Sequence, residues 1–248
     1  MNKIPSVADY ATSGGFDLVV EHVSAYRRLH ELVAEAVIAN LPEKRTGGVF
    51  SVLEMGCGPG YGLHAIQERA ALEHVNVNLS GVEYQEGNVL SAQKRVPDAH
   101  IIQGDAHHTR FPDEAFDGVV ITNMLYLTNV KEVLREVRRL LVPGGAVVIS
   151  EPLDTADMMK ILFGEISLRW QESGIRGVIR LGRSLIRSGR AVASALRYNS
   201  RVTSGSGVTK FSEREWKMQV EAAGLVVDRS MLVYHNQNTF IVAHSPRV

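Results

Sequence analysis

Residues 52–62 read VLEMGCGPGYG, and this stretch decides how the rest of the chain is interpreted. An apolar run typical of a buried strand is followed by glycines at positions 56, 58, 60 and 62. Glycines directly after a first strand allow a sharp turn and let a ligand lie against the main chain. No Lys-Ser or Lys-Thr pair follows, which excludes a Walker phosphate loop, and a GxGxxG dinucleotide fingerprint would need its third glycine at Tyr61. The GxGxG spacing therefore weakens the case for a pyrophosphate ligand.

Segments with strand-like and helix-like patterns alternate around this loop. Strands are predicted at 50–55, 78–84, 99–106, 116–125 and 146–152, with a closing pair at 226–235 and 238–245; helices are predicted at 17–41, 61–72, 86–95, 130–141 and 212–225. The helix over 130–141 is expected to stop at Pro143-Gly144-Gly145. This order predicts an α/β fold with a doubly wound, mostly parallel sheet, in which ligands bind at the carboxyl ends of the strands.

The chain divides into four segments by this pattern. We expect an N-terminal helical cap over 1–45, a Rossmann-like core over 46–152, a helical insertion over 153–210 and a closing helix with two strands over 211–248. The core contains the glycine loop and is expected to bind the ligand, whereas the insertion interrupts the strand–helix rhythm.

Composition limits the classes of protein that fit. The 248 residues carry a formal net charge of +0, which argues against a chain built as a whole to bind nucleic acid. Cys57 is the single cysteine, so no intramolecular disulfide forms and a reducing compartment is expected. The first residues lack the apolar region of a signal peptide, and no apolar run is long enough to span a bilayer. We therefore expect a cytoplasmic protein.

The next acidic residue at a predicted strand end is Glu83, within the segment GVEY. A carboxylate at that place accepts hydrogen bonds from both hydroxyls of a ribose in nucleoside sites. The separation from Gly56 is longer than the roughly 20 residues of a dinucleotide fold. The glycine loop and Glu83 together indicate a nucleoside ligand without a strong phosphate requirement.

Four segments then resemble, in order and spacing, the motifs of class I S-adenosylmethionine-dependent methyltransferases, most closely the branch that acts on small molecules. They are VLEMGCGPGYG, GVEY, GDAHHTRFPDEAFDGVVITNMLYLTN and LLVPGGAVVISEP. The resemblance covers residues 50–152 well and the C-terminal strands loosely. It implies a seven-stranded sheet whose last strand is antiparallel, with S-adenosyl-L-methionine as the cofactor.

The resemblance also implies roles for individual cofactor-binding residues. The loop residues Gly56, Cys57, Gly58 and Gly60 would surround the methionine portion, and Glu54 would hold the loop and reach the amino group through water or backbone. The other implied contacts are Glu83 with the ribose, Tyr84 near the adenine, Asp105 and Ala106 at the adenine amino group, and Asn123 at the amino-acid end. Cys57 is interpreted as a small buried residue of the turn and not as a nucleophile.

Methyl transfer needs alignment and exclusion of water, and it needs a base only where the acceptor must lose a proton. The catalytic residue is therefore the least readable part of the sequence. Candidates are His107, Tyr126 and His22, and the candidates for substrate contact are Tyr10, Tyr26, Tyr126 and Glu151. We expect no metal site.

A run of arginines without any acidic residue follows in the insertion. Over 174–198 the arginines at 176, 180, 183, 187, 190 and 197 fall on one arc of about 100° of a helix, opposite Val178, Leu181, Leu185, Val192 and Leu196. Three interpretations stay open for this basic helix: a lid with solvated arginines, a site for an anionic acceptor, and a contact with an anionic membrane surface.

The sequence thus predicts a methyltransferase that acts on a small-molecule acceptor, with O-methylation as the first choice and N- or C-methylation open, and with no nucleic-acid partner. Two alternatives remain. One is a protein that binds S-adenosylmethionine for a regulatory role or for other chemistry. The other is a nicotinamide-dependent reductase, against which the GxGxG spacing argues.

Overall fold

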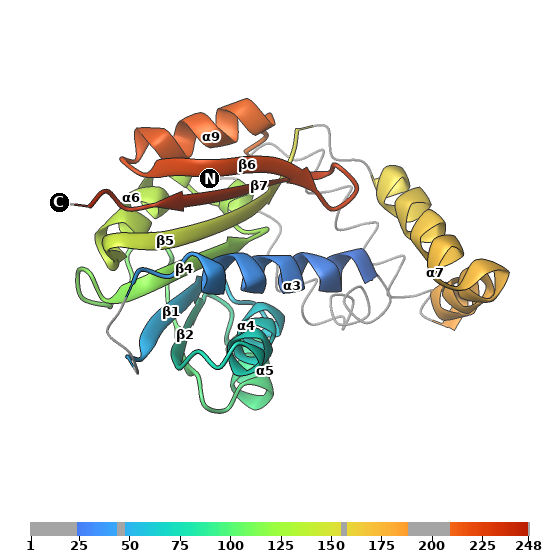
Figure 1. The fold of residues 1–248 in the computed structure, drawn as a ribbon, viewed down its shortest axis with the longest axis horizontal. Coiled ribbons are helices and arrows are strands. Elements are labelled where there is room, and N and C mark those ends of the chain that lie inside the picture. Colours follow the sequence, from blue (N-terminus) through green and yellow to red (C-terminus); the bar gives the residue numbers. More distant parts are fainter. Residues whose placement is uncertain (1–23, 44–47, 155–157, 188–208, 248) are drawn as a thin grey trace.

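A computed structural model of the chain describes residues 24–43, 48–154, 158–187 and 209–247. Its centre is a sheet of seven strands in the order β3-β2-β1-β4-β5-β7-β6 (Figure 1). The strands are β1 Phe50–Met55, β2 Val77–Glu83, β3 His100–Gln103, β4 Phe116–Thr122, β5 Leu141–Pro152, β6 Val226–Val233 and β7 Asn238–His244. β7 runs antiparallel to both of its neighbours, and β1 to β5 are parallel. The predicted doubly wound sheet with an antiparallel last strand is confirmed.

Helices cover both faces of the sheet. The helices α3 (Ser24–Ala39), α4 (Tyr61–Leu72) and α5 (Glu86–Arg95) pack on one face, and α6 (Val130–Leu140) and α9 (Glu213–Ala222) pack on the other (Figure 1). Neighbouring strand residues point to opposite faces, so Val52 joins the first layer and Leu53 the second. Burial on both faces explains why β4 is apolar almost throughout.

The strand β5 begins earlier than the sequence predicts. It starts at Leu141, not at 146, and so includes the Pro143-Gly144-Gly145 turn that was expected only to stop the preceding helix. Its pairing with β4 shifts between Phe116 and Gly118, so the extra residues form an irregularity in the ladder. Backbone hydrogen bonds with Ser245 hold this segment: the Gly144 N–H donates to the Ser245 carbonyl, and the Ser245 N–H donates to the Gly145 carbonyl.

One long helix, α7 (Met158–Arg187), lies between β5 and β6 in the sequence and stands at one end of the sheet (Figure 1). It begins well before the predicted basic helix, and Gly174 breaks it with φ 56° and ψ −147°. Residues 188–198 of that prediction lie outside the described residues. Within the described ranges, no helix combines the length and the hydropathy needed to cross a bilayer.

Candidate functional site

The glycine loop lies at the carboxyl end of β1, as predicted. Gly56, Gly58 and Gly60 have φ values of 67°, 51° and 87°, in the left-handed region that favours glycine. The Gly56 N–H donates to the Val82 carbonyl at 2.8 Å, which joins the loop to β2, and Gly60 is the N-cap of α4. A methyl group at Gly58 would meet no atom within 4 Å. The loop therefore has open space beside Gly58, whereas Gly56 lies against Met124 and Gly60 against Ala92.

Glu83, the last residue of β2, lies directly against this loop. Its carboxylate is buried and accepts the Gly58 N–H at 3.0 Å through Oε2 and the Gln85 N–H at 2.9 Å through Oε1. Each oxygen retains acceptor capacity, because an ionised carboxylate offers about four lone-pair positions. Tyr84 follows at the strand end with its side chain exposed. Glu83 thus holds the loop and retains acceptor capacity on both oxygens.

Glu54 is buried beneath the same loop, next to the start of α4. Its carboxylate lies so close to Gly62 that a methyl group there would come within 2.0 Å of Oε1. Burial raises the pKa of Glu54 to about 8, the Leu63 N–H opposes this by hydrogen bonding, and the charge of Glu83 adds to it. Oε2 has no hydrogen-bond partner among the described residues. A buried carboxylate with an unmatched oxygen suits a cationic or hydrogen-bond-donating group nearby.

The raised pKa of Glu54 predicts a stability that falls with pH. Between the ordinary value of 4.5 and about 8, the folded protein retains a proton that the unfolded chain loses, so unfolding becomes easier as pH rises through this range. Glu54→Gln cannot ionise, so its Tm relative to wild type should rise by about 8 °C between pH 5 and pH 8.5. Calorimetry on the ligand-free protein measures this. Glu68→Gln, which changes an exposed carboxylate of α4, is the control, and equal pH profiles for the two variants would contradict the assignment.

Cys57 is buried in the turn. Its thiol faces Gly81, and burial first and then the charges of Glu54 and Glu83 raise its pKa far above the ordinary value. A thiol that resists ionisation is a poor nucleophile. The geometry agrees with the interpretation of Cys57 as a small packing residue of the loop.

Asp105 lies just beyond the carboxyl end of β3, beside β2, and His107 holds it. The His107 N–H donates to Asp105 Oδ1 at 2.9 Å, and ring Nδ1 of His107 is 2.5 Å from the same oxygen. Partial burial works against ionisation of Asp105, but these hydrogen bonds and the nearby histidines outweigh it and lower the pKa of the carboxyl. The other ring nitrogen, Nε2, accepts the Asn129 N–H at 3.1 Å, at the N-cap of α6.

This arrangement bears on the predicted role of His107. Because Nε2 accepts a backbone N–H, the proton of the neutral ring is on Nδ1 and is donated to Asp105. Both nitrogens are engaged, so neither is available to remove a proton from an acceptor. The geometry argues against His107 as the general base and makes it a link between the Asp105 loop and α6.

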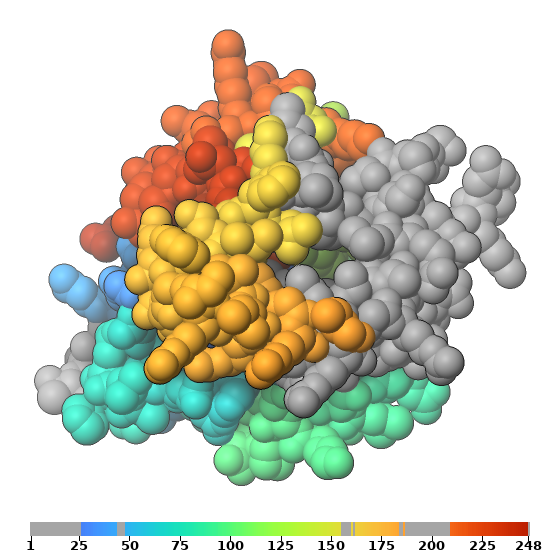
Figure 2. Space-filling model, turned by 90° about the vertical axis from the view of Figure 1, so that its right-hand side faces the viewer, coloured from blue at the N-terminus to red at the C-terminus, as the bar shows by residue number. Residues whose placement is uncertain are grey.

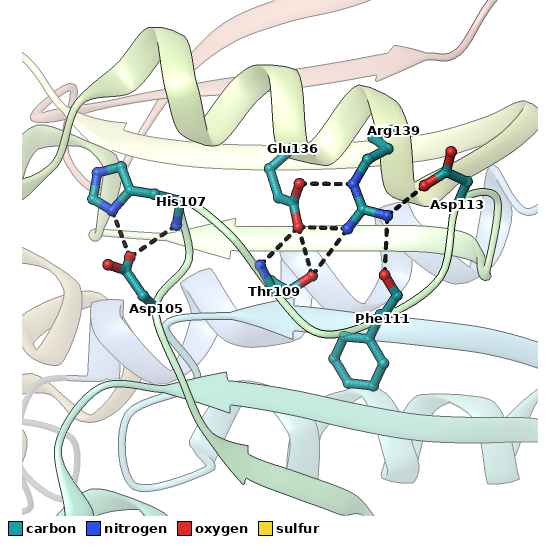
Figure 3. A network of polar contacts seen from close by, with 7 residues as sticks. All are labelled: Asp105, His107, Thr109, Phe111, Asp113, Glu136 and Arg139. Atoms are coloured by element: carbon teal, nitrogen blue, oxygen red, sulfur yellow. Dashed lines mark hydrogen bonds and ion pairs between the residues drawn. The ribbon is translucent and has the colours of Figure 1, made fainter.

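A second link fixes the same loop to α6 (Figure 3). Glu136 accepts from the backbone N–H and the hydroxyl of Thr109 at 2.8 and 2.7 Å. Arg139 donates to Glu136, to the Phe111 carbonyl at 3.0 Å and to Asp113 at 2.6 Å. Burial opposes ionisation of Glu136, but the bonds from Arg139 and Thr109 lower its pKa, so the pair is charged. The loop that carries Asp105 is therefore fixed at both ends of α6.

Glu151 does not line an open site. Its side chain is fully buried, and it accepts backbone N–H groups from Met124, Leu125 and Tyr126 at 2.9, 2.9 and 3.3 Å. It therefore holds the turn after β4, which argues against the predicted contact with an acceptor. Tyr126 lies in that turn, half-buried against the α6 side of the core, and its carbonyl accepts the Thr209 N–H.

Asn123 is fixed across the sheet. It has a left-handed φ of 52°, and its side-chain oxygen accepts from the Asn238 amide at 2.7 Å at the start of β7. Its own side-chain nitrogen remains a potential donor. The predicted contact with the amino-acid end of the cofactor stays a prediction, with Asn238 as the residue that would set its orientation.

Tyr26, on α3, packs on the hairpin between β6 and β7. Its buried ring meets His30 and Tyr234 edge to face, with centroids 4.7 and 6.2 Å apart. A cavity of about 180 Å³ lies beside it, lined by Arg28, Leu29, Leu32, Leu168, Val233, Tyr234 and His235. The wall thus combines α3, α7 and the hairpin. Tyr10 and His22, the other predicted residues of the cap, lie outside the described residues.

Several supporting residues were not predicted. Glu136 and Arg139 have helical i, i+3 spacing that indicates an ion pair, but nothing local shows that the pair holds the loop at 109–113. Asn238 acts through its hydrogen bond to Asn123, which is far away in the sequence. Gly62, on α4, acts through its contact with Glu54 on β1. These roles depend on which strands become neighbours.

The chain is similar in sequence to known methyltransferases. Residues 53–149 match the family described as a methyltransferase domain. Over 235 residues the chain is 29% identical to dTDP-3-amino-3,4,6-trideoxy-alpha-D-glucopyranose N,N-dimethyltransferase of Streptomyces venezuelae, covering 84% of this chain and 92% of that protein. It is 30% identical over 122 residues to demethylmenaquinone methyltransferase of Thermotoga maritima, covering 49% and 48% of the two chains.

The crystal structure of the cyclase SpnF has the same fold, with a TM-score of 0.59 at 15% identity, over 91% of this chain and 82% of that one. The chain spans 34 to 48% of the length of the first curated relatives it matches. The matched domain covers residues 53–149, and the motifs and the fold are similar to those of class I S-adenosylmethionine-dependent methyltransferases.

Proposed function

We propose that this protein transfers a methyl group from S-adenosylmethionine to a small-molecule acceptor. The observation that carries the proposal is the pair of carboxylates at the ends of two adjacent strands, Glu83 as the last residue of β2 and Asp105 just after β3, together with a glycine loop that has open space at Gly58. Neighbouring acceptors of this kind suit the ribose and the adenine of one nucleoside. The absence of a lysine in the loop agrees with a ligand that lacks phosphate.

The residues present fit the cofactor. Glu83 would accept the ribose hydroxyls, and Asp105 would accept the adenine amino group through Oδ2, since His107 occupies Oδ1. The exposed ring of Tyr84 would cover the adenine. The unmatched oxygen of Glu54 supports a cationic methionine end near the loop, reached through water or backbone. When bound, the cofactor supplies an activated methyl group on sulfur.

The protein's own contribution is to orient the reactants and exclude water. Both ring nitrogens of His107 already have hydrogen-bond partners, and His22, the other histidine candidate, lies outside the described residues. We therefore assign no general base. We keep O-methylation as the first choice and N- or C-methylation as the alternatives. The Streptomyces relative is named as an N,N-dimethyltransferase and the Thermotoga relative as acting on demethylmenaquinone, so the relatives do not favour one atom.

We place the acceptor between the N-terminal cap and the insertion. The cavity there is walled largely by Leu29, Leu32, Leu168 and Val233, which favours an acceptor with an apolar part. Arg28, on the same wall, pairs with Glu172 of α7 and so joins the cap to the insertion.

The decisive experiment uses S-adenosylmethionine labelled in its methyl group. The full chain is incubated with fractionated pools of metabolites and lipids, and transfer of label to a product is expected. Tight binding of S-adenosylhomocysteine without transfer to any pool would favour a protein that keeps the cofactor for another purpose, as the fold shared with a cyclase allows. Binding of NADPH without binding of S-adenosylhomocysteine would favour a reductase.

His107→Ala should weaken binding of S-adenosylhomocysteine by about three- to tenfold, because Asp105 loses the group that orients it. Isothermal titration calorimetry measures the change, and His108→Ala, at the exposed neighbour, is the control. A general base would behave differently: kcat would fall while cofactor affinity stayed unchanged. That outcome would contradict the positioning role.

A further inference from the structure

The two halves of α7 make different contacts. The first half is anchored, because Gly164 lies directly against the ring of His235 in the hairpin, and a methyl group there would come within 2.4 Å of that ring. Glu172, near the end of this half, pairs with Arg28 of α3. The second half begins after the break at Gly174, where a left-handed φ lets the helix change direction.

The second half has one buried side. Gly177 and Leu181 are buried, and Val178 is half-buried beside them. These positions agree with the predicted apolar side of the basic helix. The helix therefore packs on the molecule through this strip, while Ile175, Arg176, Ile179, Arg180, Arg183 and Ile186 are exposed.

The outward side carries apolar residues that do not belong to the predicted apolar side of the basic helix. Ile175, Ile179 and Ile186 are 58%, 48% and 81% exposed. At roughly 100° per residue they fall within an arc of about 40°. Trp170, just before the break, is 58% exposed as well. Isolated exposed apolar residues are ordinary, but a strip of isoleucines on one face indicates a surface that is covered in use.

Positive charge flanks this strip. Three exposed arginines lie beside the isoleucines: Arg176, Arg180 and Arg183. Measured around the helix axis from Ile175, the isoleucines fall at roughly 0–40° and these arginines at roughly 80–140°. From Ser173 to Arg187 the sequence contains no Asp or Glu. An apolar strip bordered by arginines, with tryptophan at one end, has the composition of a helix that lies in the interface of an anionic bilayer.

The position of α7 agrees with this. The helix lies at the end of the molecule where the parallel strands have their carboxyl ends, and it faces outward across that end (Figures 1 and 2). We propose that the outward face of α7, formed by Ile175, Ile179, Ile186, Arg176, Arg180 and Arg183, docks on an anionic lipid surface. Docking would hold the end of the molecule that carries the candidate site toward the bilayer. The proposal concerns binding and does not depend on methyl transfer.

Vesicle co-sedimentation of the full chain tests the proposal. We expect binding to phosphatidylcholine vesicles that contain about a third phosphatidylglycerol, little binding to pure phosphatidylcholine, and weaker binding at high salt. A triple variant should lower the partition coefficient of the protein onto the anionic vesicles about a hundredfold; it carries Arg176→Gln, Arg180→Gln and Arg183→Gln. The control replaces Arg110, Arg135 and Arg214, which are exposed on other elements, and should bind nearly as wild type does.

The isoleucines separate membrane insertion from simple charge attraction. Ile175→Gln with Ile179→Gln should lower binding to the anionic vesicles at least about tenfold, whereas Leu72→Gln with Leu90→Gln, at exposed positions of α4 and α5, should not. Because all of these positions are exposed, folding is checked by an unchanged Tm. Absence of vesicle binding would overturn the proposal.

Two further results would assign the face to another partner. If the control variants lost vesicle binding as strongly as the α7 variants do, the attraction would be nonspecific and directed at polyanions. The same conclusion would follow if the isoleucine variant bound vesicles as wild type does and the protein also bound a single-stranded oligonucleotide in a salt-sensitive way. Alternatively, light scattering could show that wild type self-associates, that the isoleucine variant does not, and that neither binds vesicles. The face would then be a contact between two copies of the chain. Either result overturns docking on lipid.

Discussion

Glu83→Ala should weaken binding of S-adenosylhomocysteine by about 10- to 150-fold, as measured by isothermal titration calorimetry. The carboxylate ends β2 beside the loop and accepts the Gly58 and Gln85 N–H groups. Its loss removes the proposed acceptor of the ribose hydroxyls and also releases the loop backbone. Hydrogen bonds to a charged group are the stronger kind, so the effect should exceed that of His107→Ala.

A ligand series separates the two contributions of Glu83. Wild type should bind a 2′-deoxy analogue of S-adenosylhomocysteine more weakly than the parent, and Glu83→Ala should bind the two alike, because the acceptor of the missing hydroxyl is gone. Glu86→Ala removes a nearby exposed carboxylate of α5 and is the control for general electrostatic attraction. A discrimination against the deoxy analogue that persists in Glu83→Ala would remove Glu83 from the ribose site.

Gly62→Ala should destabilise the folded protein by about 2–3 kcal/mol and lower its Tm by roughly 5–10 °C. The added methyl group would lie 2.0 Å from Oε1 and 2.7 Å from Cδ of Glu54, which is buried and cannot move into solvent. Gly87→Ala is a closely matched control, because Gly87 is likewise the second residue of its helix, α5, and a methyl group there meets nothing within 4 Å.

A double-mutant cycle tests the cause. In a Glu54→Ala background the obstructing carboxylate is absent, so Gly62→Ala should become neutral or stabilise by up to about 1 kcal/mol through helix propensity. Chemical denaturation of the four proteins measures the coupling. If the cost of Gly62→Ala were the same in both backgrounds, its origin would lie in the backbone and not in the contact with Glu54.

Local pattern predicted the elements well, and the misses have a physical cause. Strands β1 and β4 and helices α4 to α6 lie close to their predicted bounds, because hydrophobic period is a local property. The early start of β5 was missed because Ser245, far away in the sequence, pairs with the Pro-Gly-Gly turn. The helical stretch before Gly174 lies within the helical insertion expected over 153–210, but the break at Gly174, the first residue of the predicted basic helix, was not predicted.

The candidate site divides in the same way. The sequence alone determined the glycine loop and placed Glu83 and Asp105 at strand ends, because strand order and glycine spacing are written along the chain. It could not distinguish a carboxylate that faces a ligand from one that faces backbone. Tertiary structure decided that Glu151 holds the turn after β4 and that His107 joins Asp105 to α6, because hydrogen-bond partners are set by which elements become neighbours. It also decided that the isoleucines of α7 face outward beside the arginines, since the side of a helix that becomes buried depends on what it packs against.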